Sequence, residues 1–158
     1  MLYASLKAAY LLAVVVWIGG MFFVLACLRP AVAMLEPAQR AGLMLQTLRR
    51  FLACVGAAVV VILGSGATMV GIARASALRS GLNFNMPLDW YVMAGGFVVM
   101  LAVFVHIRFR MFRRLVAAAD AGRWPDAATA LGTIRIEVLV NLVLGVFVIL
   151  VATLGQGA

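Results

Sequence analysis

The chain has 158 residues, of which 66% are hydrophobic and 11% charged, and its formal net charge is +8. Soluble domains carry about a quarter of charged residues, so this composition excludes an ordinary water-soluble fold. The positive charge does not indicate nucleic-acid binding either. The arginines flank apolar runs, and they are not interleaved with aromatic side chains that could stack on bases.

Four apolar runs make up most of the sequence, at about residues 3–28, 51–73, 90–109 and 138–154. Each has about the 20 residues that a helix needs to cross a hydrocarbon core. In lipid every backbone amide must pair within its own segment, and the runs lack the alternation of barrel strands. We therefore predict an all-α membrane protein, a single domain whose four transmembrane helices form an up-down-up-down bundle.

The first run contains Tyr10, in the outer half of the predicted span, and Trp17 near its middle. Tryptophan prefers the membrane interface, so a central tryptophan indicates an indole N–H that faces a partner inside the bundle. The neighbouring Gly19 and Gly20 allow another helix to approach closely. We expect this membrane span to end at Arg29–Pro30.

Pro37 is predicted to begin the next helix, since proline suits the first helical turn. This helix is expected to pass without a break through an amphipathic segment, 38–50, into the second apolar run. In its outer half, Ser65 and Thr68 indicate either a small polar pocket shared with Tyr10, with Asp89 at its mouth, or hydrogen bonds to another helix or to carbonyls one turn away.

A polar outer connection from about residue 75 to residue 89 follows, and Pro87 near its end is predicted to open the third helix. The third helix is expected to continue past the membrane to about residue 121, where Gly122 can end it. Trp124–Pro125 then begins the last helix.

Ten of the thirteen basic residues lie in the first and third connections between the runs. Positive residues are retained on the cytoplasmic side, so both connections are predicted to be cytoplasmic and both termini periplasmic. We also expect Glu137, at the cytoplasmic start of the last span, to pair with an arginine, because a lone carboxylate there is costly. The ten residues are Arg29, Arg40, Arg49, Arg50, Arg108, Arg110, Arg113, Arg114, Arg123 and Arg135.

Three residues are candidate metal ligands, because they fall at similar depth near the cytoplasmic ends of their helices: His106, Cys27 and Cys54. His106 is the only histidine, and an ionisable residue inside the membrane indicates function by default. Two thiolates and an imidazole suit Cu(I) or Zn(II), and an imidazole alone can bind copper or haem iron. The alternatives are ordinary packing for the cysteines and, for His106, pairing with water or with Glu137.

Other intramembrane candidates are Met93 and Met100, which share one helical face with Met111, and Asn141 in the last run. A row of thioethers could pass Cu(I) along the third helix, although methionine also fills gaps in ordinary cores. Asn141 indicates a hydrogen bond to another helix or back to a carbonyl. The sequence has no nucleophile–base pair, no paired carboxylates and no phosphate-binding glycine loop, so it does not favour an enzyme.

Eight short segments spread over the chain carry a family resemblance: Leu6–Tyr10, Trp17–Phe23, Leu28–Ala31, Arg49–Phe51, His106–Phe109, Trp124–Pro125, Ile134–Arg135 and Asn141–Leu142. Together they resemble the copper resistance protein D family in its short, stand-alone form with four helices. The first helix also resembles the small bacterial membrane protoporphyrinogen oxidase, which binds haem b.

The main resemblance implies a multi-pass protein of the bacterial inner membrane that binds or moves copper within the lipid bilayer. Two alternatives remain: a haem-b redox protein, and an accessory subunit of a larger membrane complex, such as a respiratory enzyme, without chemistry of its own. Both relatives commonly place histidine where this chain has Tyr10. His106 is then the only histidine left, so haem held by two histidines of one protomer is excluded. A homodimer is also an expected partner arrangement, since four helices leave much surface for a second copy.

Overall fold

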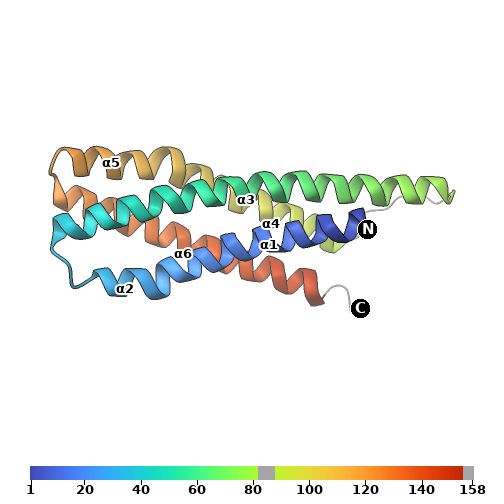
Figure 1. The fold of residues 1–158 in the computed structure, drawn as a ribbon, viewed down its shortest axis with the longest axis horizontal. Helices are drawn as coiled ribbons and strands as arrows, with labels where there is room; N and C mark the ends of the chain where they lie inside the picture. The colour runs from blue at the N-terminus through green and yellow to red at the C-terminus, as the bar shows by residue number, and fades with distance from the viewer. Residues whose placement is uncertain (82–87, 155–158) are drawn as a thin grey trace.

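The computed structural model describes residues 1–81 and 88–154, apart from the side chain of Asp89. Within those residues every regular element is a helix, either an α-helix or a π-helical turn (Figure 1). The predicted opening of the third helix at Pro87 lies outside the described residues. In chain order the elements are α1 (Leu2–Phe23), η1 (Val24–Leu28), α2 (Arg29–Val32), α3 (Pro37–Arg79), α4 (Leu88–His106), η2 (Ile107–Met111), α5 (Phe112–Asp120) and α6 (Trp124–Leu154).

These elements make four long helices, because the π-helical turn η1 joins α1 to α2 and η2 joins α4 to α5. Each long helix contains an 18-residue window with a mean hydropathy of at least 2.0. All four are therefore long and apolar enough to cross a membrane. The predicted all-α membrane fold with four spanning helices is confirmed.

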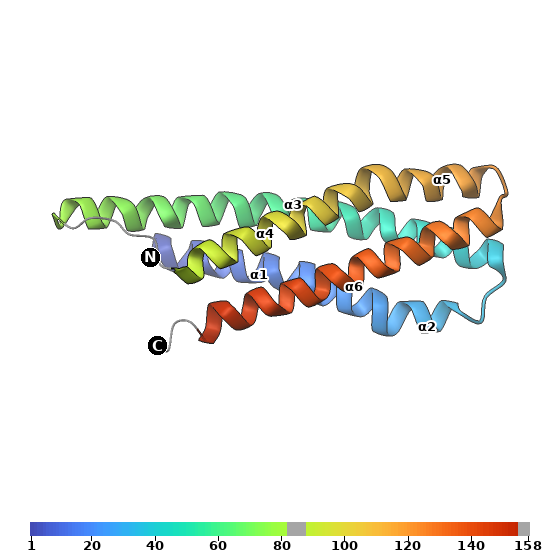
Figure 2. The ribbon, with the colours of Figure 1, turned by 180° about the vertical axis from the view of Figure 1, so that it is seen from behind.

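The long helices lie side by side along most of their length, and each runs antiparallel to the next in sequence (Figures 1 and 2). α1 packs mainly against α3, and α6 packs against both α4 and α5. The start of α1 and the end of α6 lie at one end of the bundle. The other end holds α2, the start of α3 and the turn from α5 to α6, and we call it the basic end because most of the arginines lie there.

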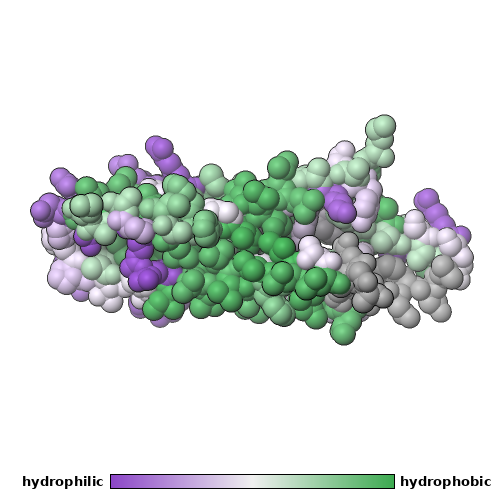
Figure 3. Space-filling view, turned by 90° about the horizontal axis from the view of Figure 1, so that it is seen from below, coloured by the Kyte–Doolittle hydropathy of each residue, from purple (hydrophilic) through white to green (hydrophobic). Residues whose placement is uncertain are grey.

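An apolar belt covers the middle of the face shown in Figure 3, and hydrophilic residues gather toward the two ends. The belt includes large apolar side chains that point outward. Leu12, Val60, Val98 and Phe147, one from each long helix, are all more than half exposed. A contiguous apolar surface of this extent fits lipid and does not fit water.

Three glycines, Gly20, Gly96 and Gly145, allow the helices of the bundle to approach closely, and a β-carbon at Gly145 of α6 would overlap Cδ1 of Ile18 on α1. A β-carbon at Gly20 of α1 would lie 2.5 Å from Cε2 of Phe51 on α3. A β-carbon at Gly96 of α4 would lie 2.5 Å from Cγ2 of Val148 on α6. Gly20 therefore has the close-packing role that the sequence predicted, whereas its neighbour Gly19 faces open space.

The first helix continues past Arg29–Pro30, where the sequence predicts the end of the membrane span, and ends at Val32. In an α-helix the proline ring collides with the carbonyl group four residues earlier. Here the N–H of Arg29 reaches the carbonyl of Val24, five residues back, so a wider π turn precedes the proline. This wider turn accommodates Pro30 within the helix.

Other helix boundaries follow the prediction more closely. α3 begins at Pro37, α6 begins at Trp124, and Gly122 adopts φ +66° just after α5 ends. The outer connection starts later than predicted, because α3 continues to Arg79. A helix of 43 residues is about 65 Å long, and α3 projects past the start of α1 (Figure 1).

Candidate metal site

His106 and Glu137 form a pair that joins two helices. His106 is the last residue of α4, Glu137 lies in α6, and Nδ1 of the imidazole is 2.9 Å from Oε1 of the carboxylate. The histidine side chain is 44% exposed and the glutamate side chain 19%. The alternative that paired His106 with Glu137 is confirmed, and the expected pair between Glu137 and an arginine is wrong.

Helix geometry explains why the carboxylate selects the histidine. Arg135 lies two residues before Glu137, so the two side chains leave α6 on different sides. Arg135 lines a cavity beside α2 and α3, whereas Glu137 faces α4, where His106 meets it. The sequence pattern alone does not reveal this division between the two faces.

The pair determines which imidazole nitrogen is free. A neutral imidazole carries one N–H, and Nδ1 is the nitrogen that faces the carboxylate, so Nδ1–H donates to Oε1. Nε2 is then left with its lone pair. Metal-binding histidines have this arrangement, since they commonly donate the other ring N–H to a carboxylate that fixes the tautomer and the ring orientation.

Two acceptor oxygens on the same face of α6 lack a hydrogen-bond donor. Oε2 of Glu137 and Oδ1 of Asn141 are both buried, and neither has a partner among the described residues. The two residues are one helical turn apart, and Asn141 is only 2% exposed. The side-chain carbonyl of Asn141 therefore accepts no hydrogen bond within the described residues. Buried acceptors usually have partners, so both oxygens remain available to a donor or a cation.

The two cysteines do not join the histidine. Cys27 in η1 and Cys54 in α3 are both exposed free thiols. In the part of the chain that the structure describes, no three His, Cys, Asp or Glu side chains are grouped to hold a metal ion. Residues at the same depth in the membrane can point to different sides of their helices. Leu52 and Val55 of α3 face the core, whereas Cys54 between them lies on the exposed side.

Four other predicted residues do come together. Tyr10, Trp17, Met93 and Met100 line one small pocket of about 130 Å³ between α1, α3, α4 and α6, in the half of the bundle away from the basic end. Met100 and Met111 are buried and Met93 is half-buried, so the predicted methionine face of the third long helix points into the bundle. The pocket combines two thioethers with a largely apolar wall, in which Tyr10 and Thr153 carry hydroxyl groups.

The remaining polar residues of this region bond within their own helix. Oγ of Ser65 donates to the carbonyl of Val61 at 2.6 Å, and Oγ1 of Thr68 donates to that of Gly64 at 2.7 Å. The alternative of bonds to a carbonyl one turn away is confirmed for both residues. Trp17 is buried against aromatic rings, and no hydrogen bond from its indole N–H is found within the described residues.

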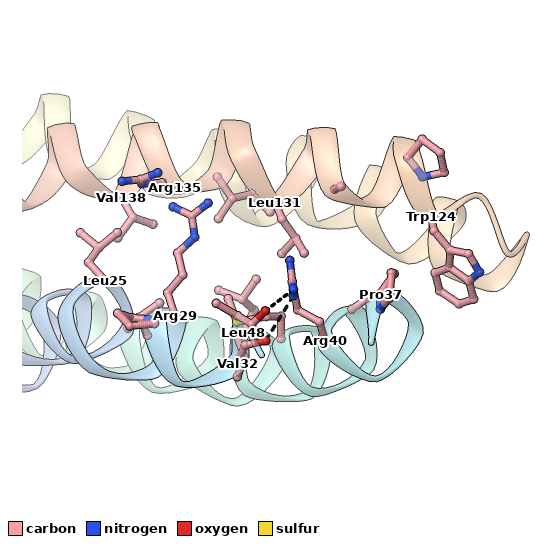
Figure 4. A pocket seen from close by; sticks show the side chains of 18 residues that line it. Leu25, Arg29, Val32, Pro37, Arg40, Leu48, Trp124, Leu131, Arg135 and Val138 are labelled. Atoms are coloured by element: carbon pink, nitrogen blue, oxygen red, sulfur yellow. Dashed lines mark hydrogen bonds between the residues drawn. The ribbon is translucent and has the colours of Figure 1, made fainter. Parts of the chain in front are cut away.

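One feature of the structure was not foreseen from the sequence. Arg29, Arg40 and Arg135 line a single cavity of about 710 Å³ at the basic end, between α2, α3 and α6 (Figure 4). In the sequence these residues belong to two separate clusters of positive charge, which membrane orientation fully explains. Their convergence depends on the contact between the first hairpin and α6, for which the sequence has no signal.

The profile of the family described as Copper resistance protein D matches residues 45–154, well over half of the chain. The chain belongs to the copper resistance protein D family. The matched range includes His106, Glu137, Asn141 and the methionine face of the third long helix, but it begins inside α3 and leaves out α1. No curated protein and no solved structure matches the chain.

Family membership and the four apolar helices together establish a multi-pass membrane protein of the copper-resistance type. The resemblance to the protoporphyrinogen oxidase rested on the first helix, which the CopD match does not reach. The family profile thus supports the first of the two resemblances and not the second.

Proposed function

We propose that this protein binds copper through Nε2 of His106 and passes the ion within or across the membrane. The observation that carries the proposal is the 2.9 Å contact between Nδ1 of His106 and Glu137. It leaves Nε2 as a free donor with a fixed direction, and imidazole nitrogen suits copper. Glu137 acts as a positioning residue, because it holds the ring and does not itself contact the ion.

The exposure of His106 supports transfer of copper rather than storage. A storage site surrounds its ion with ligands of the same chain, whereas this imidazole is 44% exposed and has no second His or Cys ligand grouped with it among the described residues. An ion held here keeps open positions that a donor, an acceptor or a second copy of the chain can fill. Copper is therefore cargo in this proposal.

Charge distribution supports a membrane orientation for this site. Ten of the thirteen basic residues belong to the two connections at the basic end. If positive residues stay inside, the basic end faces the cytoplasm of a bacterial cell and both termini face the periplasm. His106 then lies in the cytoplasmic half of the inner membrane, and the pocket of Tyr10, Met93 and Met100 lies in the periplasmic half.

The pocket lined by Tyr10, Trp17, Met93 and Met100, which we call the outer pocket, supplies a second contact for the same copper ion. Met93 and Met100 line it from α4, the helix that ends in His106. Thioether sulfur selects Cu(I) over harder ions. We propose that Cu(I) contacts these sulfurs on its way along α4 to or from the imidazole.

The direct test is copper binding by the purified full-length protein in detergent. We expect about one copper ion per chain and at least a tenfold weaker affinity in His106→Gln, which lacks the imidazole but can still donate an N–H to Glu137. The matched control is Cys27→Ser/Cys54→Ser, which should bind like the native chain. Unchanged binding in His106→Gln, or a haem absorption band in the native protein without copper binding, would contradict the proposal.

A further inference from the structure

The cavity at the basic end has walls from three helices. Arg29 reaches into it from α2, Arg40 from the start of α3 and Arg135 from α6 (Figure 4). The side chain of Arg29 extends from α2 toward Arg135 on α6. Three positive charges from segments distant in sequence therefore face one space.

These charges have no counter-charge in the cavity wall. None of its lining residues is acidic. Within the described residues, Glu137 pairs with His106 and Asp126 with Arg123, and neither Arg29 nor Arg135 forms an ion pair or a side-chain hydrogen bond. Like charges that converge without an anion repel one another. The described lining residues therefore supply no acidic side chain that could balance these three charges.

Arg40 is held in place by the chain itself. Its Nε donates to the carbonyl of Val32 at 3.2 Å, and a terminal nitrogen donates to that of Leu35 at 3.1 Å and to that of Ala33. These bonds close the short turn between α2 and α3. Arg40 thus forms a rigid positive wall, while the guanidinium donors of Arg29 and Arg135 remain free.

The remaining wall of the cavity is apolar, so an anion that fills the cavity must also have an apolar part. Side chains such as Leu25, Leu48, Leu131 and Val138 line the cavity beside the arginines. A volume of about 710 Å³ is far larger than an inorganic anion requires. Trp124, a residue type that prefers the membrane interface, stands at the same cavity. A ligand with a charged oxyanion and an apolar body matches all three features.

We propose that this cavity binds the phosphate group of an anionic phospholipid, with Arg29 and Arg135 as its charged ligands and the apolar wall in contact with the acyl-chain end. Guanidinium groups present paired N–H donors whose geometry matches phosphate oxygens. Free phosphate shares the oxyanion chemistry, but it leaves the apolar wall without a partner. The proposed lipid site is independent of copper binding at His106.

The test is native mass spectrometry of the delipidated full-length protein in detergent. It is titrated in separate arms with phosphatidylglycerol, with phosphatidylcholine of the same chain length and with inorganic phosphate. We expect one phosphatidylglycerol to bind per chain and phosphatidylcholine to bind much more weakly. Arg135→Gln, which removes no bond within the described protein, should weaken phosphatidylglycerol binding about tenfold. Arg29→Gln/Arg135→Gln should abolish it.

The matched control is Arg113→Gln/Arg114→Gln, which removes the same charge from exposed positions on α5 outside the cavity. This control should change the affinity for phosphatidylglycerol less than twofold. Arg29→Lys/Arg135→Lys keeps the charge and should therefore bind more phosphatidylglycerol than Arg29→Gln/Arg135→Gln, but less than the native chain. Equal losses in the cavity and control variants would overturn the proposal, because the effect would then be net charge alone. Tight binding of inorganic phosphate with no lipid preference would overturn the lipid assignment.

Discussion

The indole of Trp17 meets the ring of Phe97 edge to face, with the ring centroids 5.9 Å apart and the planes inclined by 86°. A second ring on the same helix, Phe104, lies 6.2 Å from the indole at 69°. Trp17 thus fills the space between two turns of α4, and it is 2% exposed. The contact anchors α1 to the helix that carries the methionines and His106.

Replacing Trp17 by Ala should destabilise the bundle more than a change at any outward-facing aromatic position. The substitution leaves a cavity among Phe97 and Phe104, and such truncations cost about 3–5 kcal/mol. Unfolding in mixed detergent micelles, followed by circular dichroism, measures the effect. Phe22→Ala is the control, because Phe22 is 58% exposed on the same helix and should lose much less. Equal losses for both variants would show that Trp17 does not organise the core.

Glu137→Gln should weaken copper binding without abolishing it. The amide keeps the shape of the side chain but no longer stabilises Nδ1–H of His106 as a charged acceptor does. Loss of such a supporting contact typically reduces metal affinity about 10–100-fold. Copper titration of the purified variant measures this change. Asp126→Asn removes the same charge from an exposed pair with Arg123 and should leave the affinity unchanged.

Met93→Ile/Met100→Ile should slow copper passage while leaving binding at His106 intact. The change removes both thioethers from the outer pocket and largely conserves volume, so the fold should persist. Copper uptake into liposomes that contain the variant, measured under reducing conditions, should fall several-fold, because thioethers bind Cu(I) selectively. Met34→Ile is the control, since Met34 is 94% exposed and lies outside the pocket. An unchanged uptake rate would exclude the sulfurs from the route.

The proposed orientation predicts opposite labelling of two introduced cysteines. In a Cys27→Ser/Cys54→Ser background, Ser80→Cys should react with a membrane-impermeant maleimide added to intact cells, and Ala121→Cys should react only after lysis. Ser80 follows α3 at the end with three basic residues, and Ala121 follows α5 at the basic end. The reverse pattern would place His106 in the periplasmic half and invert the direction of the proposed route.

The long helices could be predicted because each depends on local properties of the sequence. Apolar length selects a spanning helix, Gly122 supplies the positive φ that ends one, and Pro37 begins another. The continuation through Pro30 could not be predicted in this way. It depends on a π turn, which the sequence pattern does not distinguish from an α turn.

The candidate site residues could be predicted in part. Their residue types stand out in the sequence, but which of them contact one another depends on how the helices pack. His106, Met93 and Met100 are conspicuous in any apolar run, and the structure places the two methionines in one pocket with Tyr10. Which side chains meet depends on helix rotation, which separates Cys27 and Cys54 from His106. The arginine cavity needs three helices to converge, so no single segment indicates it.

The π turns η1 and η2 change the direction in which the following residues point around the helix axis. This direction, as much as depth in the membrane, decides what those residues contact. A π turn holds about one residue more than an α turn, which rotates everything beyond it by roughly 100° around the helix axis. Arg29 directly follows η1, and α5 directly follows η2. Losing one residue from η1 would change the length of the helix little, yet Arg29 would rotate away from the cavity toward lipid. Small insertions and deletions at this level therefore offer evolution a means of re-aiming charged groups without rebuilding the bundle.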